Sequence, residues 1–196
     1  MTLMEENTAK LIMAAMNGDL KTVTTLLPVS NPKQNNSGAL CLAANNGHTE
    51  IVKLLLPGSD PKANDSFALR RAAENGHLDI VKLLISLSNP KSRNSYALEW
   101  AAKNGHTDIV KLLLPVSNPK AKNSRALVWA TEQGHTDIIK LLLPVSDIDK
   151  AISKTKTEED ENFLLNCVRL YHAEETKKKL IESMPQSKKS CRKKKM

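Results

Sequence analysis

Asn104-Gly105-His106-Thr107-Asp108-Ile109-Val110-Lys111-Leu112-Leu113-Leu114-Pro115 is one copy of a segment that recurs along this 196-residue chain. Near-copies begin at Asn46, Asn75 and Gln133, and a diverged copy begins at Asn17. The glycine of each copy lies 29 residues after the previous one: Gly18, Gly47, Gly76, Gly105 and Gly134. A fixed period of this size indicates stacked supersecondary units, each burying its apolar face against its neighbours. We therefore expect a solenoid.

The first half of each unit predicts a helix. In the copy from 94 to 122, Ser95 is expected to cap a helix that runs to about Asn104, by accepting a hydrogen bond from an unpaired backbone N–H. Small and apolar residues then recur on one face of this helix: Ala97, Leu98, Ala101 and Ala102. Gly105 is expected to end the helix in the left-handed conformation.

The second half of each unit predicts another helix, beginning near His106 or Thr107. Asp108 falls in its first turn, where the helix dipole favours negative charge. The apolar face of this helix is broad: Ile109, Val110, Leu112, Leu113 and Leu114. Pro115 is expected to mark its end, because proline cannot continue a helix.

This unit resembles the ankyrin repeat. Its Ala-Leu-x-x-Ala-Ala matches that family's Pro-Leu-His-x-Ala-Ala, and Asn-Gly-His-x-Asp-Ile-Val-Lys-Leu-Leu-Leu matches the family's second helix. The resemblance covers about Asn7 to Lys150. It implies an all-α solenoid of about five stacked helical hairpins, with repeats near 7–35, 36–64, 65–93, 94–122 and 123–150.

The period differs from that of the family, which is usually about 33 residues. The missing residues fall between units, so we expect a shortened hairpin finger there. Similar short, near-identical ankyrin variants are multiplied in intracellular bacteria and large viruses, which favours action on a host protein by analogy of fold.

Beyond Lys150 the repeat ends, and residues 151–183 predict a helical cap over the end of the stack. Thr155 and Glu158 match the spacing of a capping box. Apolar residues then keep helical spacing: Phe163, Leu164, Cys167, Val168 and Tyr171. A second helix is expected from about Ala173 to Glu182. Residues 184–196 have almost no apolar side chain to bury, which predicts a disordered basic tail.

The tail dominates the net charge of the chain, which is +8. The 20 residues from 177 to 196 contain nine basic residues and one acid, and the charges of 1–176 cancel. From the neutral body we expect no extended positive surface. The basic tail residues Lys188, Lys189, Arg192, Lys193, Lys194 and Lys195 leave three hypotheses open: a nuclear-import or nucleic-acid patch, contact with an anionic membrane, or a solubilising end.

Metal binding and catalysis are not predicted. The histidines of the repeat (His48, His77, His106 and His135) occupy equivalent positions on stacked units, roughly 8–10 Å apart, so they cannot share one zinc ion. We expect each histidine to cap or pack at its own turn. No serine, cysteine or carboxylate outside the repeat comes with a base and an orienting third group, and no glycine-rich phosphate loop is present. We therefore expect no enzyme, no cofactor and no small-molecule substrate.

The compartment is predicted from what the chain lacks. The three cysteines (Cys41, Cys167 and Cys191) show no CxxC spacing, which favours reduced thiols. No apolar run reaches the roughly 18–20 residues of a membrane span, and the acidic N-terminus does not resemble a secretory signal. These features predict a cytoplasmic protein, with nuclear targeting by the tail as an alternative.

The recurring lysines Lys53, Lys82, Lys111 and Lys140 each follow an acid by three residues, which predicts a solvated, self-neutralised outer face. The positions that vary between units are more informative, because repeats keep their core and vary what they present. In the ankyrin family the matching positions lie on inner helices that line a concave, protein-binding surface. The predicted partner-binding residues are Phe67, Arg70, Arg71, Glu74, Asn75, Tyr96, Glu99, Trp100, Lys103, Asn104, Arg125, Trp129, Glu132 and Gln133.

Two interpretations of Trp100 and Trp129 remain open: anchors for a partner, or packing in which adjacent copies touch each other. For the whole chain we predict protein–protein interaction through the concave face, as a scaffold or a host-directed effector. The alternative is a nuclear or nucleic-acid-associated factor in which the tail supplies the affinity.

Overall fold

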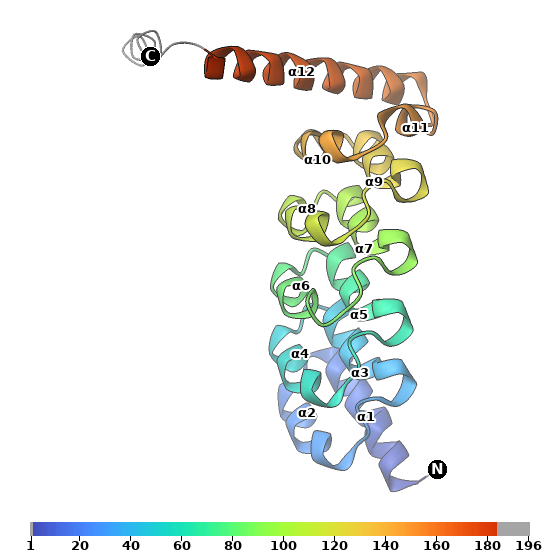
Figure 1. The fold of residues 1–196 in the computed structure, drawn as a ribbon. Coiled ribbons are helices and arrows are strands. Elements are labelled where there is room, and N and C mark those ends of the chain that lie inside the picture. The colour runs from blue at the N-terminus through green and yellow to red at the C-terminus, as the bar shows by residue number, and fades with distance from the viewer. Residues whose placement is uncertain (1, 184–196) are drawn as a thin grey trace.

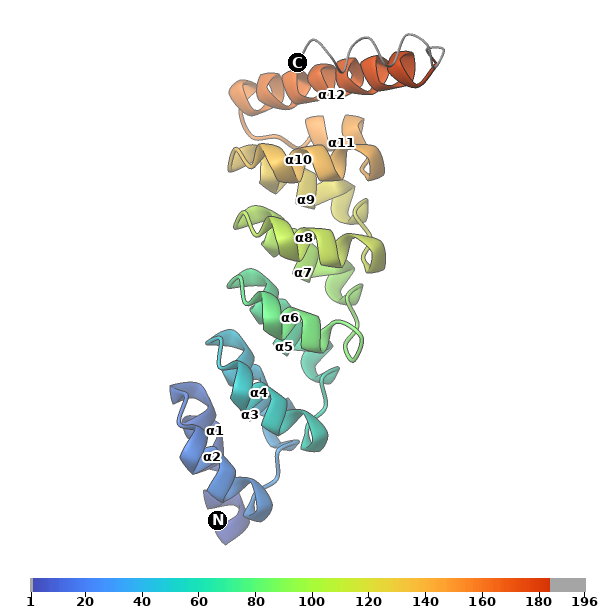
Figure 2. The same cartoon turned by 90° about the vertical axis from the view of Figure 1, so that its left-hand side faces the viewer.

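The computed structural model describes residues 2–183, which form helices and turns and no strand. Two columns of antiparallel helices rise side by side from the N-terminus (Figures 1 and 2). The inner column consists of α1 (Leu3–Asn17), α3 (Gln34–Asn45), α5 (Ala63–Glu74), α7 (Ser92–Lys103) and α9 (Ala121–Glu132). The outer column consists of α2 (Leu20–Leu26), α4 (Thr49–Leu55), α6 (Leu78–Leu84), α8 (Thr107–Leu113) and α10 (Thr136–Leu142). The architecture is the all-α solenoid of helical hairpins that the repeat predicts.

The core runs continuously along the stack, between the two columns. Inner helices bury alanine and leucine, such as Ala101 and Ala102, whereas outer helices bury branched residues such as Ile109 and Val110. Each inner helix packs on the next inner helix, and each outer helix packs on its neighbours in the same way. Small side chains on the inner helices allow this close approach, so the spacing of units follows from the repeated alanines.

The start of four inner helices, α3, α5, α7 and α9, differs from the sequence prediction. Arg93, Asn94 and Ser95 have left-handed backbone angles, with φ of 48°, 61° and 65°, so the right-handed helix begins only at Tyr96. Asparagine and aspartate, which supply several of these residues in other units, tolerate this conformation better than most residues. The prediction that Ser95 caps this helix is therefore wrong.

The Ser95 hydroxyl instead accepts a hydrogen bond from the backbone N–H of Asn118, at 2.7 Å, in the connection that follows α8. This bond recurs with the repeat, and we call the set the serine ladder: Thr8 with Asn31, Ser37 with Asp60, Ser66 with Asn89, Ser95 with Asn118, and Ser124 with Asp147. Because the hydroxyl belongs to a buried residue, it supplies an acceptor where water is excluded.

The connection between units is short and forms no strand pair in the described residues, in line with the expected shortening of the finger. Four outer helices continue instead into a 3₁₀ turn that holds the repeat's proline: η1 (Leu27–Val29), η2 (Leu56–Gly58), η3 (Leu114–Val116) and η4 (Leu143–Val145). An extended serine follows, such as Ser117, and the left-handed turn then leads into the next inner helix. The 29-residue period leaves room for this turn and not for a strand pair.

Glycine and histidine join consecutive units at the opposite end of the hairpin. Gly105 has φ of +78°, as its helix-ending position predicts, and a Cβ there would lie 2.8 Å from Cε1 of His135. The Nε2 atom of His135 lies 3.0 Å from the carbonyl oxygen of Lys103, and it donates the bond because a carbonyl oxygen can only accept. His48, His77 and His106 make the same contact with the preceding unit. The histidine column therefore packs one unit on the next.

The C-terminal end of the stack is covered by α11 (Ile148–Ile152) and α12 (Glu158–Ser183). Leu164 and Cys167 of α12 are buried, and Phe163, Val168 and Tyr171 pack against the core. The prediction of a separate helix from Ala173 is wrong, because α12 is a single helix of 26 residues. Its C-terminal part projects beyond the stack (Figure 1).

The predicted capping box is also wrong. Thr157 caps α12 by accepting a bond from the backbone N–H of Asp160, whereas the Thr155 hydroxyl donates to the carbonyl oxygen of Ile152. Among residues 2–183, no helix has the length and apolar character needed to cross a membrane.

Candidate functional site

Aromatic and basic side chains gather on three consecutive inner helices. We call this surface the inner face and define it by seven residues: Phe67 and Arg71 of α5, Tyr96, Trp100 and Lys103 of α7, and Arg125 and Trp129 of α9. All seven are half-buried or exposed. The alanines and leucines of the same helices point into the core, so the opposite side of each helix carries the residues that vary between units.

The inner face has two hollows. The first has a volume of about 330 Å³ and is lined by Asn64, Phe67, Arg70, Arg71, Glu74, Arg93, Tyr96 and Trp100. The second has a volume of about 370 Å³ and is lined by Lys122, Asn123, Arg125, Val128, Trp129, Glu132, Lys154 and Lys156. Each hollow therefore combines one tryptophan with several cations.

Lys103 lies between the two tryptophans. Its Nζ atom is 4.2 Å from the centre of the Trp100 ring and 4.2 Å from the centre of the Trp129 ring. The negative π faces attract the ammonium group and hold it in place. Both rings are half-buried and both contact the Lys103 ammonium group, so the structure is compatible with packing between units and with anchoring of a partner.

Most cations around the inner face already have a carboxylate. Arg71 pairs with Glu74 at 2.9 Å, and Lys156 pairs with Glu132 at 2.9 Å. Lys103 differs, because no carboxylate of residues 2–183 forms an ion pair with its ammonium group. Its charge is stabilised by two rings and left unneutralised by the part of the chain that the structure describes.

Glu99 is only 5% exposed, although it varies between units like a surface residue. Its carboxylate accepts hydrogen bonds from Nε1 of Trp129 at 3.2 Å and from Nζ of Lys122 at 3.3 Å. Nε of Arg125 also lies 2.8 Å from it. Glu99 therefore holds three side chains that line the second hollow, Lys122, Arg125 and Trp129, and is itself buried.

Arg70 is 7% exposed and has a similar internal role. Its guanidinium donates to the carbonyl oxygens of Asn64 and Asp65, at 3.1 and 3.2 Å, and so holds the left-handed turn that precedes α5. The same group lies 5.1 Å from the ring centre of Phe67. Burial lowers the pKa of Arg70 from its usual value, and the charge of Arg93 lowers that pKa further.

Asn75 and Asn104 are exposed at the edge of the inner helices, but their amides also join units. Nδ2 of Asn75 donates to the carbonyl oxygen of Asn45 at 2.8 Å, and Nδ2 of Asn104 donates to that of Glu74 at 2.7 Å. Gln133 lies at the equivalent position of the last unit and is exposed. This column combines a structural contact with a surface position.

Basic residues outnumber acidic residues around the inner face, although the charges of the whole body cancel. Eight basic residues line or flank the inner face (Arg70, Arg71, Arg93, Lys103, Lys122, Arg125, Lys154 and Lys156), against four acids (Asp65, Glu74, Glu99 and Glu132). The balancing acids lie elsewhere, many of them on the outer helices. There Glu50, Asp79 and Asp108 pair with the lysine three residues later, as predicted. Lys140 departs from this pattern and approaches Glu174 of α12 at 4.0 Å.

Four of these basic residues were missed by sequence reasoning. Arg93 and Lys122 are one period apart and belong to the left-handed turns. The sequence prediction treated these segments only as connections between helices. Lys154 and Lys156 lie beyond the repeat, and only the three-dimensional structure brings them to the second hollow. The 29-residue spacing of Arg93 and Lys122 was the available signal.

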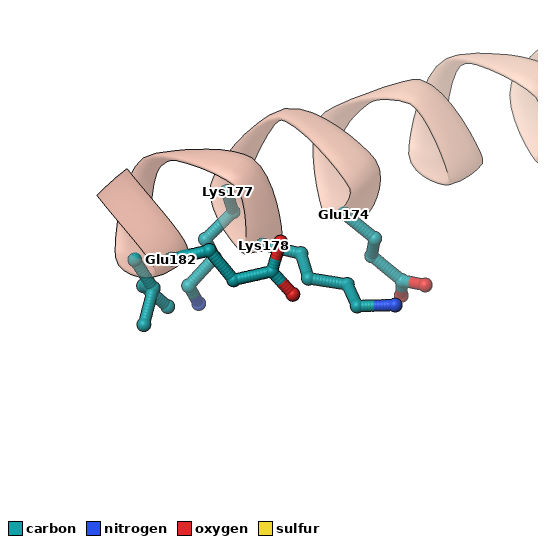
Figure 3. A pocket seen from close by; sticks show the side chains of 5 residues that line it. Glu174, Lys177, Lys178 and Glu182 are labelled. Atoms are coloured by element: carbon teal, nitrogen blue, oxygen red, sulfur yellow. The ribbon is translucent and has the colours of Figure 1, made fainter. Parts of the chain in front are cut away.

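Other features of the described residues do not form a second site. A shallow hollow of about 290 Å³ near the end of α12 is lined by residues of that one helix, and Figure 3 shows Glu174, Lys177 and Lys178 along it. Residues 2–183 contain no group of three or more histidine, cysteine or acidic side chains placed to hold a metal ion. Burial raises the pKa of the Cys41 thiol to about 11, so this buried thiol is protonated at neutral pH. The predicted tail residues, from Lys188 to Lys195, lie outside the described residues.

Comparisons with known proteins agree with the geometry. A search of curated proteins found no match to the chain. The sequence profile described as ankyrin repeats (three copies) matches residues 11–94 and 69–154. These matches include every inner and outer helix from α2 to α10, and therefore the whole inner face. Ankyrin repeats are generally protein–protein interaction modules, typically without enzymatic activity. The chain belongs to the ankyrin-repeat family.

Proposed function

We propose that this chain is a binding module that holds a partner protein on the inner face of α5, α7 and α9. The observation that carries the proposal is the cluster of Phe67, Tyr96, Trp100 and Trp129 with cations over their rings, on three consecutive units. Tryptophan, tyrosine and arginine dominate the residues whose truncation costs protein interfaces most binding energy. The equivalent positions of the preceding unit are Gly38 and Leu42, so the cluster is confined to the later units.

The arrangement favours binding over chemistry. The side chains of the inner face hold one another through cation–π contacts and ion pairs, which fixes their positions before a partner arrives. Pre-organised side chains lose less conformational entropy on binding, which increases affinity. A scaffold or a host-directed effector would use such a face in the same way, and identification of the partner distinguishes these roles.

Photo-crosslinking tests the proposal directly. A benzophenone amino acid replaces Tyr96 on the inner face in one full-length variant and Lys111 on the outer helix α8 of the same unit in another. Both variants are irradiated in extracts of the cells that express the chain. We expect a discrete crosslinked protein from position 96 and not from position 111. Crosslinks to one protein from position 111 alone would contradict the proposal.

A further inference from the structure

We infer that the inner face binds an extended acidic segment of the partner, with a carboxylate at about every third residue and one of these carboxylates on Lys103. This inference rests on the proposed function and adds the chemistry of the partner. It differs from the proposed function in what it excludes, because a partner that offers a basic or a purely apolar segment is incompatible with it.

The charge of Lys103 is the first argument. Its ammonium group is half-buried between Trp100 and Trp129, and no carboxylate of residues 2–183 forms an ion pair with it. Ring faces stabilise a cation without neutralising it or accepting strong hydrogen bonds from it. An incoming carboxylate at this position gains a charge-assisted hydrogen bond in a partly desolvated site, where such bonds are strongest.

The surrounding cations are the second argument. Towards α5, Arg71 and Arg93 line the first hollow together with Arg70. Towards α11, Lys154 and Lys156 line the second hollow together with Lys122 and Arg125. The chain's own carboxylates neutralise only part of this positive charge, through ion pairs of Glu74, Glu99 and Glu132. The excess of positive charge favours an acidic partner by complementarity and steers its approach.

The spacing of the units gives the expected register of the segment. Packed helices lie about 8–10 Å apart, so Lys103 and the two hollows follow one another at roughly this interval. A polyproline II segment rises about 3.1 Å per residue with three residues per turn, so every third side chain returns to the same face after about 9 Å. A segment of about nine residues with an acid at each third position therefore presents one carboxylate to each hollow and one to Lys103.

The same rings disfavour single-stranded nucleic acid, the other acidic ligand that aromatic residues recognise. Stacking of a base needs an open ring face. Here Lys103 lies over both tryptophans, Lys156 lies 4.7 Å from the ring centre of Trp129, and Arg71 lies 4.9 Å from that of Phe67. Bases would have to displace these cations, whereas carboxylates approach them directly.

The chain's own fluorescence provides the assay, because its two tryptophans are Trp100 and Trp129. The protein is the full-length chain with Lys188, Lys189, Arg192, Lys193, Lys194 and Lys195 replaced by glutamine, which we call the tail-neutral chain. The probe is the peptide Glu-Pro-Pro repeated three times, and the matched peptides carry Gln or Lys in place of Glu. Tryptophan emission is followed during each titration at low ionic strength.

We expect a saturable change in emission with the Glu peptide and none with the Lys peptide. Lys103→Met keeps the apolar stem between the rings and should weaken binding by about tenfold or more, as the loss of one desolvated charge pair does. Lys103→Arg should retain binding. Lys111→Met, which removes the same charge from the outer face of the same unit, should change the affinity by less than about twofold. Far-UV circular dichroism and melting temperatures check that each variant is folded.

Three results would overturn the inference: no binding of the Glu peptide at millimolar concentration, equal binding of the Gln or Lys peptide, or a silent Lys103→Met substitution. A fourth such result is Lys103-dependent binding of a nine-nucleotide single strand with higher affinity than the Glu peptide. In each of these cases, a crosslink from position 96 to a partner protein would leave the proposed function standing and reject only the acidic segment.

Discussion

Trp100 and Trp129 occupy the same position of successive units, but their indole N–H groups have different surroundings. Nε1 of Trp129 donates to Glu99 at 3.2 Å. Nε1 of Trp100 is buried and has no hydrogen-bond acceptor among residues 2–183. The difference follows from the residue that stands 30 positions earlier, which is Glu99 for Trp129 and Arg70 for Trp100. An arginine offers only donors, so one repeat position supplies a partner to one tryptophan and not to the other.

A matched pair of substitutions tests this contrast. Trp129→Phe removes a donor that has an acceptor, whereas Trp100→Phe removes one that has none, and both keep an aromatic ring beside Lys103. We expect Trp129→Phe to lower the free energy of unfolding by about 1 kcal/mol more than Trp100→Phe does, the usual net contribution of one hydrogen bond. Urea denaturation followed by far-UV circular dichroism measures both values. Equal losses, or a larger loss for Trp100→Phe, would contradict the hydrogen bond to Glu99.

At the scale of the element, the serines of the ladder lie where the inner helices α3, α5, α7 and α9 begin. Three left-handed residues precede the helix, and the last of them turns its hydroxyl toward the connection instead of toward its own helix. Left-handed residues other than glycine carry a conformational cost. Here this cost is offset by a hydrogen bond from the backbone N–H of Asn118, which has no other acceptor among residues 2–183. The turn therefore depends on the serine.

Two serines near each other give a controlled test of the ladder. Ser95→Ala leaves the backbone N–H of Asn118 without its acceptor and should lower the free energy of unfolding by about 1–3 kcal/mol. Ser117→Ala removes a buried hydroxyl for which the described residues supply no partner, so its effect should stay below about 0.5 kcal/mol. Thermal and urea unfolding of the two variants provide the comparison. A loss for Ser117→Ala as large as that for Ser95→Ala would count against the ladder.

Local features of the elements could be predicted from the sequence, and features that depend on a neighbouring unit could not. The left-handed Gly105 and the ion pair of Asp108 with Lys111 depend on residues within one turn, and both predictions are confirmed. Ser95 matches a local capping pattern, but its partner lies 23 residues away. A second helix was expected from about Ala173, whereas α12 continues through this residue as one helix, mostly exposed there.

The repeat positions that form the inner face could be predicted, because their residues vary between units. The burial of each side chain at these positions could not. Phe67, Tyr96 and Trp129 are partly exposed, as partner-binding residues need to be. Arg70 and Glu99 vary between units as strongly, and both are buried by side chains and backbone of the adjacent turns. Variation between repeats identifies positions free of the core, and it does not distinguish a residue that contacts a partner from one that positions its neighbours.

At the scale of the whole molecule, net charge conceals how the charges are arranged. The body sums to zero because acids on other surfaces balance the cations of the inner face. The molecule therefore has two basic regions, the inner face and the tail sequence from Lys188 to Lys195. Affinity for nucleic acid or anionic lipid, which the tail predicts, should fall steeply with salt because it arises from counterion release. Partner binding should come from the inner face.

Binding of the partner that crosslinks to position 96 tests this division most directly. Its dissociation constant is measured with the full-length chain, the tail-neutral chain, the inner-face variant Arg71→Glu/Lys103→Glu, and the outer-face variant Lys82→Glu/Lys111→Glu. Arg70 is left unchanged because it is buried and holds the turn before α5. We predict that the inner-face variant binds at least about a hundredfold more weakly, since two interface charges are reversed, and that the other two proteins bind like the full-length chain. Loss of binding by the tail-neutral chain, with full affinity in the inner-face variant, would contradict the account.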